Sequence, residues 1–186
     1  MKILIFGLPR CGTTSLHNFI IESLPKNYNV KYEPFKRVTD VNFGENCIVK
    51  TVLTDEEHDP IILKNGETLL EHSFRIIKEF DKVIYLKRKN IDNIKKSFSN
   101  FHRLKNSKEV SDLIAEVKIN EWNEIFDNVT KDKKIYYYED IFTHEPKIDI
   151  LEICDYLNIT FNVDLFNKIL HIKNRDIVKK YNKTFI

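Results

Sequence analysis

The residues best suited to do chemistry lie near the start of the chain, between a short apolar run and a helix-like segment. Residues 3–6 read Ile-Leu-Ile-Phe, and a turn with two glycines and a proline follows them up to Gly12. Thr13, Thr14 and Ser15 then open a segment whose apolar residues recur at helical spacing. A strand, a glycine loop and a helix N-terminus in this order suit a phosphate, because backbone N–H groups and the helix dipole both favour an anion there.

The spacing of the two glycines resembles that of an ATP-binding P-loop, but one key residue differs. Gly7 and Gly12 enclose four residues, as in a P-loop, but Thr13 stands where an ATP-binding loop has lysine. The loop carries its cation at Arg10 instead, between the two glycines. The alternative is a buried turn between a strand and a helix that binds no ligand.

A second group of cations follows a later apolar run. Residues 83–86, Val-Ile-Tyr-Leu, lead into Lys87, Arg88 and Lys89, and two more lysines follow at positions 95 and 96. Lysine and arginine can both bind phosphate oxygens. On its own, such a run is equally typical of a solvated basic face.

Together these segments resemble those of sulfotransferases that use 3′-phosphoadenosine 5′-phosphosulfate (PAPS). Residues 7–16, Gly-Leu-Pro-Arg-Cys-Gly-Thr-Thr-Ser-Leu, are similar to the 5′-phosphosulfate loop of these enzymes, which lacks the P-loop lysine. The resemblance implies a P-loop NTPase-like sulfotransferase fold and sulfuryl transfer from PAPS to a hydroxyl of a small-molecule or carbohydrate acceptor. It implies 3′,5′-adenosine bisphosphate (PAP) as the product, and no metal. The residues that it implies around the 5′-phosphosulfate are Arg10, Cys11, Gly12, Thr13, Thr14 and Ser15.

The basic segment resembles the 3′-phosphate-binding segment of the same enzymes. Arg88 matches their arginine and Asp92 their aspartate, while Lys96 stands where they have serine and Ser97 follows it. The resemblance therefore implies that Arg88 binds the 3′-phosphate together with either Lys96 or Ser97. Two further segments resemble parts of the family that we expect to be structural, residues 134–141 and 151–159.

Sulfuryl transfer also needs a general base for the acceptor hydroxyl and cations for the charge on the leaving phosphate. Some relatives have a histidine directly after a Lys-Thr pair; Lys50 begins such a pair here, but Val52 takes the histidine position. Carbohydrate-type relatives have a Glu-Pro pair, which implies Glu33 as the base, with His58 in reserve. The resemblance gives charge neutralisation to Arg10 and Lys50. The alternative for Glu33 is a surface glutamate without a catalytic role. The alternative for Lys50 is a lysine with a buried stem that pairs with an acid.

Alternating strand-like and helix-like segments must position these residues. Apolar or alternating runs predict five strands, at residues 3–6, 28–35, 46–53, 82–88 and 134–138. Helical spacing predicts helices at residues 16–24, 68–78, after Asn90, and at 107–126, 148–157 and 165–170. Strands that alternate with helices predict a single three-layer α/β/α domain with a mostly parallel sheet, whose ligands sit beyond the carboxyl ends of the strands.

Composition and charge exclude several other classes of protein. The chain has 186 residues, of which 42% are hydrophobic and 31% charged, and its formal net charge is +2. So small a net charge gives no overall field for nucleic acid or a membrane surface, so we expect neither partner. The strand signal starts at Lys2 and the three cysteines are scattered without CxxC spacing. We therefore expect a cytoplasmic protein with reduced thiols and no metal site.

Two other functions fit parts of the pattern. A P-loop kinase for a small molecule or nucleotide would need a lysine at the position of Thr13 and a strand ending in an aspartate for Mg²⁺. A nucleotide-binding protein without turnover is supported by Val52 and Lys96, which depart from the family pattern. His17 and the other scattered histidines show no metal-ligand spacing, and we expect them on the surface or as helix-filling residues.

Overall fold

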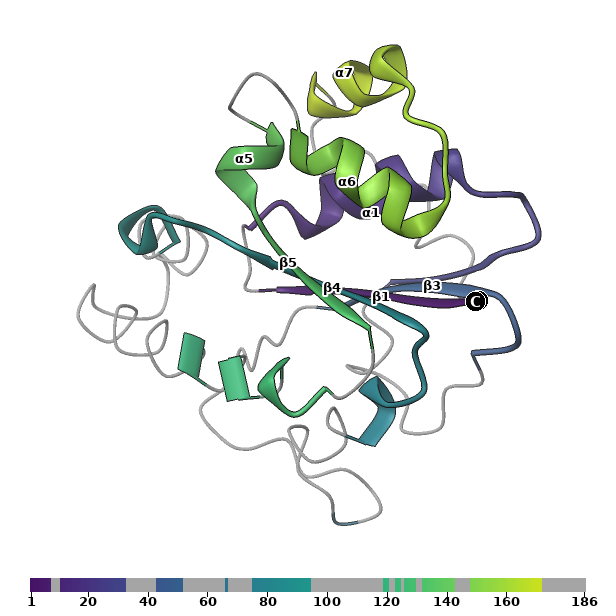
Figure 1. Ribbon diagram of the computed structural model, residues 1–186, viewed down its shortest axis with the longest axis vertical. Helices are drawn as coiled ribbons and strands as arrows, with labels where there is room; N and C mark the ends of the chain where they lie inside the picture. Colours follow the sequence, from purple (N-terminus) through teal and green to yellow (C-terminus); the bar gives the residue numbers. More distant parts are fainter. Residues whose placement is uncertain are drawn as a thin grey trace, which may run out of the picture.

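A parallel five-stranded sheet forms the centre of the molecule (Figure 1). The residues that the computed structural model describes are 1–7, 11–32, 43–51, 66, 75–94, 119–120, 123–124, 126–129, 132–142 and 148–171. The strands are β1 (Lys2–Gly7), β2 (Asn29–Tyr32), β3 (Cys47–Thr51), β4 (Lys82–Lys87) and β5 (Lys133–Tyr137). They pair in the order β2-β3-β1-β4-β5, and every pair is parallel. The predicted α/β fold with a five-stranded sheet is confirmed.

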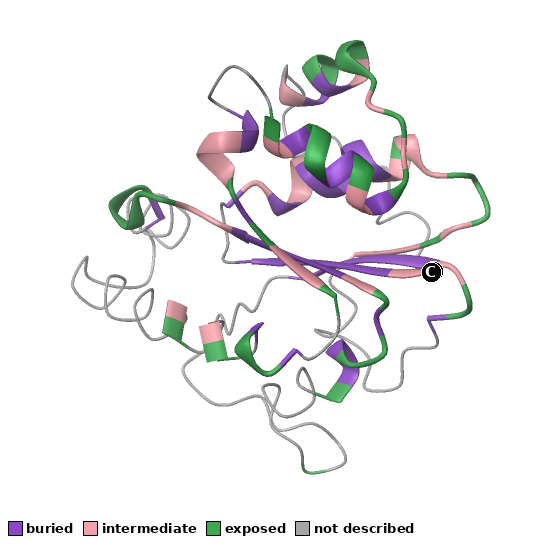
Figure 2. Cartoon of the chain, in the orientation of Figure 1, coloured by how far each residue is buried: buried purple, intermediate pink, exposed green. Residues whose placement is uncertain are grey.

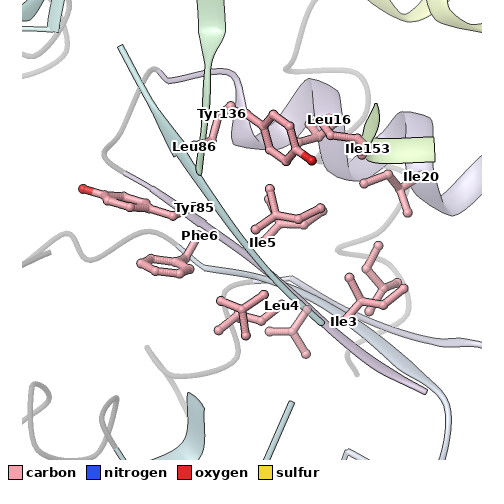
Figure 3. Close-up of a cluster of buried hydrophobic side chains, with 14 of the residues drawn as sticks. Ile3, Leu4, Ile5, Phe6, Leu16, Ile20, Tyr85, Leu86, Tyr136 and Ile153 are labelled. Atoms are coloured by element: carbon pink, nitrogen blue, oxygen red, sulfur yellow. The ribbon is translucent and has the colours of Figure 1, made fainter. Parts of the chain in front are cut away.

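The middle of the sheet is apolar on both faces. Ile3, Leu4, Ile5 and Phe6 of β1 have no exposed surface, and residues 83–86 of β4 are buried beside them. A parallel strand with helices on both faces needs such a continuous apolar run, because neither face meets water. Figure 3 shows the two directions: Ile5 and Leu86 point toward α1, whereas Phe6 and Tyr85 point to the opposite side.

Helices cover one face of this sheet. They are α1 (Thr13–Ser23), α5 (Tyr138–Phe142), α6 (Ile148–Leu157) and α7 (Val163–His171). Phe19 of α1 meets Phe166 of α7 edge to face, with 5.3 Å between the ring centroids. Helix α6 buries Ile153 and leaves Leu151 exposed, and Figure 2 shows this division between inner and outer helix surfaces. The predicted helices at 148–157 and 165–170 are confirmed as α6 and α7.

The opposite face of the sheet is covered by segments that the structure describes in part. The ring centroid of Phe126 lies 5.8 Å from that of Phe6 and 5.0 Å from that of Tyr85. Helical residues 75–77 and 126–127 lie on this side (Figure 1). Residues 75–77 fall within the helix predicted at 68–78, and residues 126–127 lie at the end of the helix predicted at 107–126; most other residues of both predicted helices lie outside the described part.

One element differs from the prediction. Tyr138, which we expected to end the fifth strand, begins α5, and the strand ends at Tyr137. Glu139 and Asp140 occupy the first turn of α5, where negative charge interacts favourably with the helix dipole. The three consecutive tyrosines favour a strand and hide this boundary from the sequence.

The strand order determines where a ligand is expected. The chain passes from β2 and β3 on one side of β1 to β4 and β5 on the other, so the order reverses beside β1. In open α/β sheets, ligands bind beyond the carboxyl ends of the strands at such a reversal. Gly7, Thr51 and Lys87 end β1, β3 and β4 at this edge.

No helix among the described residues combines the length and the apolar character that a membrane span requires.

Candidate anion-binding site

Gly7, at the end of β1, and Gly12, at the start of α1, lie on either side of the loop that joins these two elements. A Cβ atom at Gly7 would lie 2.3 Å from the carbonyl oxygen of Leu86, so only glycine fits against β4. A Cβ atom at Gly12 would lie 2.6 Å from Cδ2 of Tyr138 and 2.7 Å from Cε2 of Phe142. Gly12 also has a φ of 81°, in the left-handed region that side chains disfavour. Arg10, between the two glycines, lies outside the described residues.

The Gly12→Ala variant should lose about 2–4 kcal/mol of unfolding free energy, since it combines backbone strain with a clash against two rings. Gly66 provides the matched control, because its φ is 83° and a Cβ there would meet no atom of the described residues within 4 Å. Gly66→Ala should therefore show only the backbone cost, about 1 kcal/mol. Urea unfolding of both variants measures the difference. Equal losses would show that Tyr138 and Phe142 do not press on the loop.

Helix α1 begins directly at the loop and is open to an anion. Its N-cap is Gly12, which has no side chain to cap the helix, and the first turn carries no acidic residue. The amide of Leu16 donates to the carbonyl of Gly12 at 3.0 Å, so the helical hydrogen bonds begin there. The amides of residues 13–15 precede this bond, and such amides can bind a phosphate or sulfate group.

The side chains around this N-terminus divide into buried and half-buried ones. Cys11 has no exposed surface and Thr13 only 3%, so both can contribute to a site only through their backbone. The predicted place of Cys11 in the cofactor-binding loop stays a prediction, which its backbone alone could fulfil. Thr14 and Ser15 are half-buried at the start of α1.

Arg88 follows β4 and reaches the same edge of the sheet. Its guanidinium lies over the ring of Tyr138, with 4.2 Å from Cζ to the ring centroid. The Nε atom of Arg88 is buried and has no hydrogen-bond partner among the described residues. Tyr138 also contacts Gly12, so the start of α1 and Arg88 share one aromatic neighbour. Lys96 and Ser97, the predicted partners of Arg88, lie outside the described residues.

The carboxylates of α5 hold the chain just after Arg88. The amide of Lys89 donates to Glu139 Oε2 at 3.0 Å, and its Nζ donates to Asp140 Oδ1 at 2.5 Å. The hydrogen bond to Asp140 raises the pKa of Lys89. These contacts give the 134–141 segment the structural role that we expected for it. Asp92, the family's aspartate position, is exposed.

Lys50 lies near the end of β3 with 3% of its surface exposed. Its register neighbour in β2 is Tyr32, and Lys50 Nζ lies 4.7 Å from the centroid of the Tyr32 ring. The Tyr32 hydroxyl forms a 2.8 Å hydrogen bond with the Thr14 hydroxyl, so β2, β3 and α1 meet here. Glu33, which follows Tyr32, and His58 lie outside the described residues, and the choice of base stays a prediction.

His17 lies within α1 and is buried, so of the two expectations, a surface position or a helix-filling residue, the surface position is wrong. It has no exposed surface, and its ring meets the Tyr32 ring edge to face at 5.6 Å. Burial lowers the pKa of His17 to about 3, and the charge on Lys50 contributes to this shift. The backbone of Ile48 acts in the opposite direction and raises the pKa, but neither ring nitrogen has a hydrogen-bond partner among the described residues. The imidazole is therefore neutral at physiological pH. The helical spacing could have indicated that His17 is buried, because residues 13 and 17 lie on the same face of α1 and this face is turned toward the sheet.

In the part of the chain that the structure describes, no group of three histidine, cysteine, aspartate or glutamate side chains is arranged to hold a metal ion.

No protein-family model matches the sequence, and no curated protein matches it. Among solved structures, the mouse sulfotransferase SULT7A1 complexed with PAP matches with a TM-score of 0.54 and 16% identity, over 91% of this chain. This chain spans 62% of the length of that sulfotransferase.

Two further structures are similar in fold. The YorR protein from Bacillus subtilis, in complex with phosphorylated GDP, matches with a TM-score of 0.53 and 15% identity, over 85% of this chain and 98% of YorR. The deoxyadenosine kinase from M. mycoides with bound dATP has a TM-score of 0.48 and 20% identity, over 85% of this chain and 100% of the kinase. At these identities a likeness shows the fold alone, and this chain has the P-loop α/β fold.

Proposed function

We propose that this protein is a PAPS-dependent sulfotransferase that transfers the sulfuryl group to a hydroxyl of a small-molecule or carbohydrate acceptor. One observation carries the proposal: Gly12, at the start of α1, and the Arg88 guanidinium both contact the Tyr138 ring. A helix N-terminus suits one phosphate, and an arginine beside it suits a second. A donor with phosphate groups at its 5′ and 3′ positions needs two such sites close together.

The buried Nε of Arg88 strengthens this argument. A buried donor without a partner costs free energy, so it marks a place where an acceptor group is expected. The Tyr138 ring under the guanidinium keeps that donor in place without using its hydrogen bonds. Arg88 is thus suited to the 3′-phosphate, with Lys96 or Ser97 as the second ligand.

The other predicted residues have roles in the sulfuryl-transfer step. The sulfur–oxygen bond to the donor phosphate breaks as sulfur bonds to the acceptor oxygen, and PAP leaves. Glu33, with His58 in reserve, takes the proton of the acceptor hydroxyl. Arg10 neutralises the charge that collects on the leaving phosphate, and Lys50 stabilises the sulfuryl group during the transfer.

The position of Thr13 favours this reaction over ATP-dependent phosphoryl transfer. In an ATP-binding P-loop, a lysine at this position reaches the β- and γ-phosphates. Thr13 is only 3% exposed, and its methyl group would lie 3.1 Å from a Cβ at Gly7, so its side chain packs back against β1. An ATP-binding site here would need its cation from another residue.

A second candidate is a kinase or binding protein for a nucleoside phosphate. The observation in its favour is length: this chain covers 98% of YorR, whose structure holds phosphorylated GDP, but 62% of the sulfotransferase. Such a protein would bind a nucleotide at the start of α1 and need no 3′-phosphate site.

Calorimetric titration with PAP, AMP and ATP–Mg²⁺ tests the two candidates. We expect PAP to bind about tenfold or more tightly than AMP, because even one charge-assisted hydrogen bond to the 3′-phosphate is worth this much. EDTA should leave the PAP affinity unchanged. Binding of ATP–Mg²⁺ with no response to PAP would overturn the sulfotransferase proposal and favour a kinase. No heat from any ligand would favour a protein that has kept the fold without its donor site.

A further inference from the structure

We infer that Tyr32 is a positioning residue that holds the Lys50 ammonium group and the Thr14 hydroxyl in one fixed arrangement beside the start of α1. This inference rests on the proposed function, in which Lys50 neutralises charge near the sulfuryl group. Three contacts of Tyr32 carry it: one through the hydroxyl, one through the face of the ring and one to the ring from His17.

The hydroxyl contact joins the sheet to the helix. Tyr32 ends β2, and Thr14 is the second residue of α1, so the 2.8 Å hydrogen bond between their hydroxyls joins a strand end to the first helical turn. The first turn of α1 is also where the 5′-phosphosulfate is proposed to bind. The bond therefore fixes the Thr14 side chain relative to the end of β2.

The ring contact holds a buried charge. Lys50 lies between Ile5 of β1 and Tyr32 of β2 in the register of the sheet, and only 3% of it is exposed. An ammonium group in such a place needs electronegative neighbours, and the Tyr32 ring, 4.7 Å from Nζ, is one of them. The ring thereby helps to determine where the cation stands.

His17 fixes the plane of the ring. It contacts the Tyr32 ring edge to face, with centroids 5.6 Å apart and an angle of 64° between the planes. His17 is neutral, so it adds no second positive charge next to Lys50. With its hydroxyl bonded to Thr14 and its ring against His17, Tyr32 presents one defined surface to Lys50.

This arrangement predicts a selective effect on the donor. PAPS carries the sulfuryl group and PAP does not, so a residue that places Lys50 should matter for PAPS and hardly for PAP. Tyr32→Leu removes the ring and the hydroxyl, and it should weaken PAPS binding about tenfold while PAP affinity stays within about twofold. Tyr32→Phe keeps the ring and should retain most of the preference for PAPS. Lys50→Met should have the same effect as Tyr32→Leu, and the double variant should be no worse than either, because the two residues act as one unit.

Tyr28→Leu is the matched control, because Tyr28 is also half-buried but lies just before β2, at the other end of the strand. It should leave the ratio of PAPS to PAP affinity unchanged. Nitrogen-15 NMR of the Lys50 ammonium group adds a readout without ligand. Its signal should move in Tyr32→Leu and stay near its wild-type position in Tyr28→Leu.

The outcomes separate the two proposals. If the wild-type protein binds PAPS and PAP but Tyr32→Leu weakens both equally or neither, the inference about Tyr32 is wrong and the proposed function stands. An additive double variant, or a Lys50 signal that ignores Tyr32→Leu, would also overturn it. If the wild-type protein binds neither PAPS nor PAP, the proposed function fails and this inference fails with it.

Discussion

Arg88→Ala should weaken the binding of PAP about 100-fold, because a guanidinium that makes two charge-assisted hydrogen bonds to a phosphate is worth about 3 kcal/mol. The same variant should leave AMP affinity within about threefold, since AMP has no 3′-phosphate to lose a partner. Titration of both ligands with both proteins gives four affinities, from which the contribution of Arg88 to the 3′-phosphate follows directly.

Folding should change little in this variant. Arg88 is half-buried and lies over the Tyr138 ring, so its removal should cost about 1 kcal/mol of unfolding free energy. Lys82→Ala is the matched control: it removes a cation from the opposite end of β4, where Lys82 pairs with Asp132 at 2.7 Å. The control should bind PAP like the wild type. Equal PAP affinity in Arg88→Ala and wild type would remove Arg88 from the site.

The second large effect concerns stability in acid. The pKa of His17 is about 3 in the folded protein and about 6.5 in the unfolded chain, so between these values only the unfolded chain binds this proton. Proton uptake by the unfolded state favours unfolding, and the contribution of His17 to stability is lost as the pH falls from 6.5 toward 3. The loss is about 1.4 kcal/mol per pH unit, or roughly 2–3 kcal/mol at pH 4.5.

His17→Leu isolates this effect because leucine fills much of the same space and does not titrate. Other groups titrate alike in both proteins, so the difference in urea-unfolding free energy between the variant and the wild type isolates His17. When the pH falls from 7.5 to 4.5, the wild type should lose roughly 2–3 kcal/mol more stability than the variant. At pH 7.5 the variant should be at least as stable as wild type, because it removes two buried nitrogens that have no partner among the described residues. A gap that stays constant with pH would mean that His17 reaches water or a partner in solution.

The sequence indicates well the strand and the helix on either side of the glycine loop of the candidate site. At β1, the loop and α1, an apolar run, two glycines and helical spacing all indicate the same structure, and each has a local cause. The continuous apolar runs also predict a buried parallel sheet, which the structure confirms. These features depend on neighbours in the chain, and a single sequence contains that information.

The missed features depend on contacts between distant positions. Nothing in the spacing of Tyr138 indicates that its ring touches Gly12 and Arg88, because both contacts arise only when β5 lies beside β4. The order of the five strands is equally absent from a linear pattern. The contact of Tyr32 with Lys50 requires knowing that β2 and β3 are neighbours in register.

The contact between Gly12 and Tyr138 has a consequence for synthesis of the protein. A ribosome makes the glycine loop first, yet the ring that packs against Gly12 comes from α5, much later in the chain. Phe142 of the same helix stacks on Phe166 of α7, with ring centroids 5.8 Å apart, so the loop is linked to elements made still later. Contacts of such large sequence separation form late in folding, because the long intervening chain must first be closed into a loop. A nascent chain therefore carries its glycine loop long before Gly12 has its final support, and the nucleotide binding that we propose for this loop would report completion of the whole domain.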